Sequence, residues 1–108
     1  MTDQELEKLA VGFLDLWKEF KNSPEVRISF QRLPKVKKFI DMGLIASHVN
    51  PREGEYAIQH THSGVAFFTG SGELVFTKNG LPFARKICDI YRKQDSHMYV
   101  VQIEYCPA

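Results

Sequence analysis

The sequence predicts a small α+β domain, and three patterns support this prediction. Apolar residues recur every three or four positions in three segments, which is the period of an amphipathic helix. Elsewhere apolar and polar residues alternate, as they do in a strand with one buried face. Glycine, proline, asparagine and serine gather between these segments and indicate turns. The 108 residues suffice for one core, so we expect one domain over residues 1–108, with a helix at 1–22 and an α+β sandwich at 26–105.

The first predicted element is an amphipathic helix of about five turns at the amino terminus. Thr2-Asp3-Gln4-Glu5 has the form of a capping box, in which a hydroxyl and a carboxylate satisfy free amides at a helix start. Asn22-Ser23-Pro24 ends the pattern. The apolar stripe consists of Leu6, Leu9, Ala10, Phe13, Leu14, Trp17 and Phe20. It is wider than one small sheet requires, so part of it is available to a partner or to a second copy in a homodimer.

The middle of the chain predicts a strand, a helix and a loop. Val26, Ile28 and Phe30 alternate with polar residues and indicate a short strand. Pro34 suits the first turn of a helix, and Gly43 is a suitable end for it. The segment from residue 47 to residue 54 is expected to be a loop.

The remaining elements are three strands, a helix and a last strand. The three strands are expected at 55–61, 65–69 and 73–77. Turns at 62–64 and 70–72 separate them, because both are rich in glycine and serine. A helix is predicted over 81–93, and the alternation of the final segment predicts a strand over 98–105.

The order of these elements favours one topology over another. From residue 26 onward it is strand, helix, strand, strand, helix, strand, with one extra hairpin strand. This is the β-α-β-β-α-β plan of ferredoxin-like domains, here with an added N-terminal helix. The alternative is a winged-helix-like fold, with residues 39–45 ending the recognition helix and the loop before Tyr56 as the wing. That alternative lacks a middle helix and leaves the C-terminal half unexplained.

Charge and composition bound the functional classes. The chain has 14 basic and 13 acidic side chains, so no global field draws it to nucleic acid or membrane. Two cysteines are too few for a disulfide framework, and Cys88 lies on the apolar stripe of a predicted helix, where a buried free thiol is usual. No segment has the ~20 apolar residues that span a bilayer, and the first residues do not form a secretion signal. We therefore expect a cytoplasmic protein.

His60 and His62 are the most concentrated chemistry in the sequence. A strand would place both imidazoles on one face, where two neutral rings can chelate a divalent metal. Gly54, five residues and then His60-x-His62 resembles the opening of the first cupin motif, whose histidines bind a metal. The glutamate of that motif and a second motif are absent. The competing interpretation is a strand end where one imidazole packs and the other caps a turn.

A basic segment is the second candidate site. Five cations lie between residues 26 and 40 with no acidic residue among them, and they are Arg27, Arg32, Lys35, Lys37 and Lys38. Such a group would neutralise a few phosphates and give salt-dependent binding. A solvated helix face that keeps the chain soluble explains the same pattern.

A third candidate is an aromatic surface. Residues 63–68 are similar, at Gly64, Ala66 and Phe67, to the glycine- and aromatic-rich run of the RNA-recognition motif, whose aromatic residues stack on bases. The resemblance implies a ferredoxin-like fold and base stacking. Because Phe67 and Phe68 alternate, at most one of them is expected in the core.

We expect a small non-enzymatic binding or regulatory module. It would dock on a protein or on a nucleic acid, using the basic segment together with the uncovered part of the first helix. Complete catalytic motifs are missing from the sequence, since residues 70–72 form no phosphate loop and no serine lies in a nucleophile elbow. The alternative is a small metal-dependent enzyme or metal sensor that uses His60 and His62.

Overall fold

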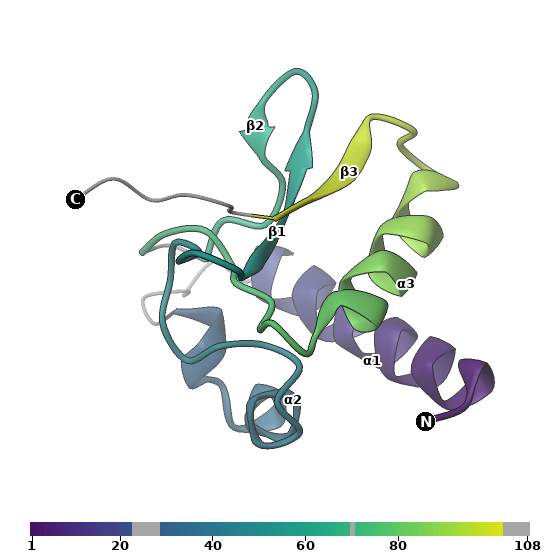
Figure 1. The fold of residues 1–108 in the computed structure, drawn as a ribbon, viewed down its shortest axis with the longest axis vertical. Coiled ribbons are helices and arrows are strands. Elements are labelled where there is room, and N and C mark those ends of the chain that lie inside the picture. Colours follow the sequence, from purple (N-terminus) through teal and green to yellow (C-terminus); the bar gives the residue numbers. More distant parts are fainter. Residues whose placement is uncertain (23–28, 70, 103–108) are drawn as a thin grey trace.

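In the computed structural model, which describes residues 1–22, 29–69 and 71–102, the chain has three α-helices and one three-stranded antiparallel sheet (Figure 1). The helices are α1 (Asp3–Asn22), α2 (Lys37–Asp41) and α3 (Leu81–Arg92), and two short 3-10 helices, η1 (Phe30–Arg32) and η2 (Pro34–Val36), precede α2. The strands are β1 (Tyr56–His60), β2 (Gly64–Val65) and β3 (Met98–Gln102). The predicted α+β class is confirmed.

The predicted capping box starts α1. The Glu5 backbone amide donates to Thr2 Oγ1 at 3.1 Å, and the Thr2 backbone amide donates to Glu5 Oε1 at 3.4 Å. These two bonds satisfy groups that a helix start otherwise leaves to water. The hydrogen bonds from Thr2 hold the pKa of the Glu5 carboxyl below its ordinary value.

Phe13 of α1 lies at the centre of an aromatic core. Its side chain is fully buried, and its ring meets the rings of three phenylalanines edge to face at centroid distances of 5.4 to 5.6 Å. These partners are Phe30, Phe39 and Phe83, which belong to η1, α2 and α3. Each such aromatic pair contributes about 1 kcal/mol beyond the burial of apolar area. One side chain therefore joins α1, η1, α2 and α3 in the same core.

The sheet has the order β2-β1-β3, and both pairings are antiparallel. Ile58 lies opposite Val100, and Gln59 lies opposite both Val65 and Tyr99. Helix α3 packs against β1 and β3 and also against α1 (Figure 1). The helices α1 and α3 are in direct contact along their lengths.

Two predicted strands are shorter than expected. The strand predicted at 65–69 is limited to Gly64–Val65, and the segment 73–77 forms only isolated bridges. Its backbone changes partner at almost every residue. The Leu74 amide donates to Phe67 O, Val75 O accepts from the Ala46 amide, and Phe76 exchanges two bonds with Tyr56. A continuous ladder needs one partner strand, so none forms here.

Other predictions fall partly outside the described residues. The strand predicted from Val26 has its first residues there, and Phe30 belongs to η1 instead of a strand. The ferredoxin-like order begins with that strand and stays a prediction. The last strand is described to Gln102, and its predicted remainder lies beyond the described part. Among the described helices, none has the length and apolarity needed to cross a membrane.

Candidate functional site

The basic segment is presented to solvent in the part that the structure describes. Arg32, Lys35, Lys37 and Lys38 are exposed, whereas Arg27 lies outside the described residues. Lys37 Nζ is 3.1 Å from Asp41 Oδ2 one helical turn later, and both side chains are largely in water. Exposed pairs of this kind contribute little to stability. Unlike Lys37, both Lys35 and Lys38 lie on the side of this segment that faces α1.

A groove runs between α1 and the η2–α2 segment, and we name it the α1–α2 groove. It consists of two adjoining hollows of about 430 Å³ and 580 Å³, which share Gly12, Asp15 and Lys38. Leu16, Glu19, Pro34 and Lys35 complete the lining of the first hollow. Met1, Glu5, Lys8, Leu9, Val11 and Met42 complete the lining of the second. The structure therefore joins two of the predicted basic residues to the outer side of α1.

Gly12 leaves the middle of this groove open. It lies within α1, and a Cβ added at this position would meet no atom within 4 Å. Glycine in a helix interior costs about 1 kcal/mol relative to alanine, and no close contact of the described chain requires it. Beside it, Val11 and Met42 are 45% and 47% exposed. This part of the groove is apolar, open and free of side-chain bulk.

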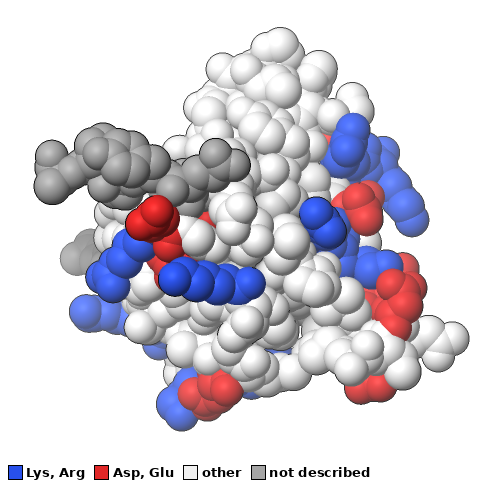
Figure 2. Space-filling model, viewed as in Figure 1, with Lys and Arg blue, Asp and Glu red and all other residues white. Residues whose placement is uncertain are grey.

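The charge of the groove is mixed. Lys35 and Lys38 share the first hollow with the carboxylates of Asp15 and Glu19. Figure 2 shows the same mixture on the visible face, where basic and acidic side chains lie next to one another. Carboxylates beside two lysines weaken the local attraction for a phosphate backbone. The acid-free run in the sequence is thus not an acid-free surface.

His60 belongs to a cluster that the sequence reveals only in part. His60 Nε2 is 2.8 Å from Asp95 Oδ2, and the His62 amide donates to His60 Nδ1 at 3.1 Å. Because Nδ1 accepts a hydrogen bond, Nε2 carries the proton and donates to Asp95. The His97 ring lies 5.5 Å from the His60 ring and 4.5 Å from the His62 ring, between centroids. The antiparallel pairing of β1 with β3 brings the segment after α3 to the His60 end of β1.

The cluster contains a turn cap, as in the competing interpretation, but the capping ring is that of His60, and His62 is exposed. His62 follows β1 in the turn before Gly64, and its amide is capped by the His60 ring. The His97 amide bonds to Asp95, and this contact, together with that from His60, holds the pKa of Asp95 below its ordinary value against a smaller effect of burial. Within the described residues, no group of three or more histidine, cysteine, aspartate or glutamate side chains has the arrangement of a metal site. A metal at His60 would have to displace one of its two hydrogen bonds.

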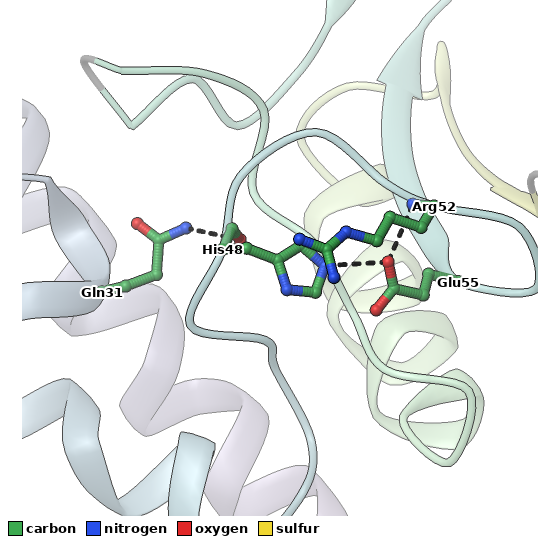
Figure 3. Close-up of polar contacts among 4 residues, drawn as sticks. All are labelled: Gln31, His48, Arg52 and Glu55. Atoms are coloured by element: carbon green, nitrogen blue, oxygen red, sulfur yellow. Dashed lines mark hydrogen bonds and ion pairs between the residues drawn. The ribbon is translucent and has the colours of Figure 1, made fainter. Parts of the chain in front are cut away.

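A second polar network closes the loop before β1 (Figure 3). Glu55 Oε1 lies 2.9 Å from His48 Nε2 and accepts the Arg52 amide at 2.8 Å. Burial raises the pKa of Glu55, but these two hydrogen bonds outweigh it, and the pKa lies below its ordinary value. On the other side of the loop, the side-chain amide Nε2 of Gln31 donates to the backbone oxygen of His48 at 3.5 Å. The network holds the loop in place, and no spacing in the sequence indicates it, because His48 and Glu55 meet only when the loop folds back.

The aromatic surface is divided as the alternation predicts. Phe67 is 1% exposed and belongs to the core, whereas Phe68 is 58% exposed. The outer side of the sheet also presents Tyr99, whose hydroxyl donates to Gln59 Oε1 at 3.4 Å, and Gln59 donates to Glu73 at 3.4 Å. Base stacking by this surface stays a prediction.

Comparisons of the chain with protein-family models, with curated proteins and with solved structures give no match.

Proposed function

We propose that this chain is a non-enzymatic binding module that docks a helix of a protein partner in the α1–α2 groove. The observation that carries this proposal is the junction, in one groove, of Lys35 and Lys38 with the uncovered side of α1 at Gly12. The sequence indicates the two features separately, 23 or more positions apart. Their position in a common groove supports a single docking surface.

A helix is the occupant that fits this shape. Two helices pack with their axes 8–10 Å apart, and the smallest separations need small residues at the point of contact. Gly12 provides such a point, and its neighbours Leu9, Leu16 and Met42 offer apolar contact on both sides. An amphipathic partner helix would place apolar residues at spacings of three and four along this groove, with charged residues at its margins.

The charges of the groove favour protein over nucleic acid. A partner helix with both basic and acidic residues can pair with Asp15 and Glu19 as well as with Lys35 and Lys38. A phosphate backbone can pair only with the lysines and is repelled by the carboxylates. Charge complementarity of this kind chiefly sets specificity and association rate.

Quantitative affinity capture with four forms of the full chain tests the proposal. Gly12→Trp places an indole in the groove at a position where an added Cβ meets no atom within 4 Å, and the double variant Lys35→Glu/Lys38→Glu reverses the basic side of the groove. Lys37→Glu is the matched control, because Lys37 pairs with Asp41 and lines neither hollow. A protein captured by the wild type and by Lys37→Glu, and lost from the other two, is then purified and titrated directly. We expect its affinity to fall about tenfold or more in both groove variants.

Two results would contradict docking in this groove. One is a partner whose affinity is the same for the wild type and Gly12→Trp. The other is saturable binding of labelled single-stranded RNA or duplex DNA in fluorescence anisotropy, with a steep salt dependence that Lys35→Glu/Lys38→Glu removes. The second result would assign the basic segment to phosphate contacts.

Metal binding is the second candidate function. His97 lies beside His60 and His62, so a third imidazole is close to the two that the sequence indicates; the three side chains would have to reorient to form a metal site, because the described residues hold none as they stand. Elemental analysis of protein purified without an affinity tag tests this function. A stoichiometric metal that is lost in His60→Ala/His62→Ala supports it, and metal-free wild-type protein that also binds no added Zn²⁺ contradicts it.

A further inference from the structure

The edge of β3 that faces away from β1 is open in the described part of the chain. In the β1–β3 ladder, Thr61 donates to His97 directly opposite, so Tyr99 and Val101 are the residues of β3 that bond to β1. The backbone groups of Met98 and Val100 therefore point to the other edge. Among the described residues, nothing forms a hydrogen bond with them. An unpaired edge of this kind is a template for another strand.

A second groove follows this edge, between β3 and α3, and we name it the β3–α3 groove. It consists of two hollows of about 240 Å³ and 270 Å³ that share Arg85 and Val100. Tyr56, Leu81 and Gln102 complete the first, and Cys88, Asp89, Arg92 and Tyr99 complete the second. No lining residue is shared with the α1–α2 groove. The open backbone edge thus lies beside a hollow that side chains of an added strand can enter.

The β3–α3 groove has an excess of basic side chains that attracts acidic residues. Arg85 and Arg92 are exposed and lie on the α3 side, separated along the helix axis by about 10 Å, and one carboxylate, that of Asp89, lies between them in sequence. Figure 2 shows basic side chains with acidic ones among them on the side of the molecule where α3 lies. Strand β3 itself has no charged residue, and natural edges commonly use such residues to prevent pairing. The arginines lie on α3 beside the open edge and not on β3, so they can bind an acidic strand without preventing its pairing with β3.

We propose that the β3–α3 groove binds an extended acidic peptide segment, which adds a fourth strand to the sheet next to β3. Main-chain bonds to Met98 and Val100 would provide affinity, and the two arginines would provide specificity. Side chains on one face of a strand are about 6.8 Å apart, so acidic residues two or four positions apart can reach both guanidinium groups. A small apolar residue between them would cover Cys88 and Val100.

A second copy of this chain fits the edge less well. Pairing of β3 with β3 of another copy would bring the arginines of both α3 helices toward one groove. The described strand, Met98–Gln102, contributes no acidic residue to compensate for them. The like charges would oppose this pairing, whereas an acidic segment removes the conflict.

Peptide selection followed by anisotropy tests the proposal. The full chain is immobilised and used to select from random twelve-residue peptides displayed on phage. We expect enriched peptides to carry acidic residues two or four positions apart, with β-branched residues between or beside them. A fluorescein-labelled synthetic copy should then bind the wild type, and Arg85→Glu/Arg92→Glu should weaken it about tenfold or more. Lys93→Glu, at the end of the same helix but outside both hollows, should leave the affinity unchanged.

Two further variants separate strand addition from simple charge attraction. Val100→Pro removes an outward N–H and leaves the hydrogen bonds between β1 and β3 in place, because proline is tolerated at a sheet edge. It should lower the affinity for the peptide as strongly as the arginine reversals do. A peptide N-methylated at the alternate amides that face β3 loses the bonds that it donates to the outward carbonyls of Met98 and Val100, which decides the matter even where Val100→Pro does not fold. Peptides without acidic enrichment, no enrichment at all, or equal binding of the methylated peptide would overturn the proposal. So would a dimer in sedimentation equilibrium that Val100→Pro dissociates, because a second copy would then occupy the edge.

Discussion

Single residues in this chain carry opposite electrostatic effects on folding. Glu55 and Glu73 are both half-buried carboxyls close to the sheet. Hydrogen bonds from His48 and the Arg52 amide outweigh burial at Glu55, and its pKa is lowered. At Glu73 burial outweighs a hydrogen bond from Gln59, and its pKa is raised. The number of charge-assisted hydrogen bonds, and not burial alone, therefore decides the sign.

We predict that neutralising these two residues has opposite results. The contribution of Glu55 to the free energy of unfolding is present above the ordinary carboxyl pKa of 4.5 and is lost as the pH falls through its lower folded value. Glu55→Gln should thus destabilise at pH 7, and this effect should diminish as the pH falls below 4.5. Glu73 opposes folding when charged, so Glu73→Gln should stabilise at pH 7 and be neutral near pH 3. Urea unfolding from pH 3 to pH 8 measures both, and the same sign for both variants at pH 7 would contradict the assignment.

A second prediction at this scale concerns glycine. Gly12→Ala should raise the free energy of unfolding by about 0.5–1 kcal/mol, because alanine favours the helix and its Cβ meets no neighbour. Gly80→Ala is the contrasting variant, since its Cβ would lie 2.2 Å from Leu44 O. It should lower stability by about 1–3 kcal/mol. Thermal unfolding of both variants is the measurement, and a Gly12→Ala variant less stable than the wild type would mean that Gly12 has a structural role.

At the scale of elements, local patterns predicted the helices and failed where a partner is distant. The predicted helix at 81–93 corresponds to α3, Leu81–Arg92, because its period and its proline in the first turn are local properties. The segment 73–77 has an equally good strand pattern, but its hydrogen-bond partner changes along its length. Most of these partners are distant in the sequence, so a short stretch of sequence gives no information about them. The α1–α2 groove is of the second kind. Neither Gly12 nor Lys38 indicates the other, since only the packing of the helices through Phe13 brings them together.

We predict that Phe13 is the residue on which this packing depends. Phe13→Ala should lower the free energy of unfolding by about 3–5 kcal/mol, the range for a buried phenylalanine whose loss leaves a cavity. Val11→Ala is the control, because Val11 lies two positions before Phe13 in the same helix but is 45% exposed. This variant should change the free energy of unfolding by less than about 0.5 kcal/mol. Equal effects in urea unfolding would show that α1 is held by its outer side instead.

For the whole molecule, the class of fold follows from the sequence, but the arrangement of chemistry does not. The histidine cluster depends on the pairing of β1 with β3, which places Asp95 and His97 beside His60 across 35 or more positions. The spacing of these residues along the chain does not predict the register in which β1 pairs with β3. The open edge of β3 is equally hidden, because an edge is defined by the order of strands and not by the strand's own residues. The sequence therefore indicated which residue types could form a site, but only the fold shows which of them lie close together.

The two bridges of Phe76 bear on how the molecule opens in solution. Phe76 pairs with Ile45 on one side and with Tyr56 on the other, so one residue links the end of the helical region to the start of the sheet. The Phe76 amide donates to Tyr56 O at 2.8 Å and its residue is fully buried between these two neighbours, so we expect the amide to reach water only when the chain unfolds as a whole. In native-state hydrogen exchange the Phe76 and Tyr56 amides should therefore exchange at the rate of global unfolding, while the outward amide of Val100 exchanges orders of magnitude faster. A Phe76 amide that exchanges quickly would mean that the two regions separate as independent units.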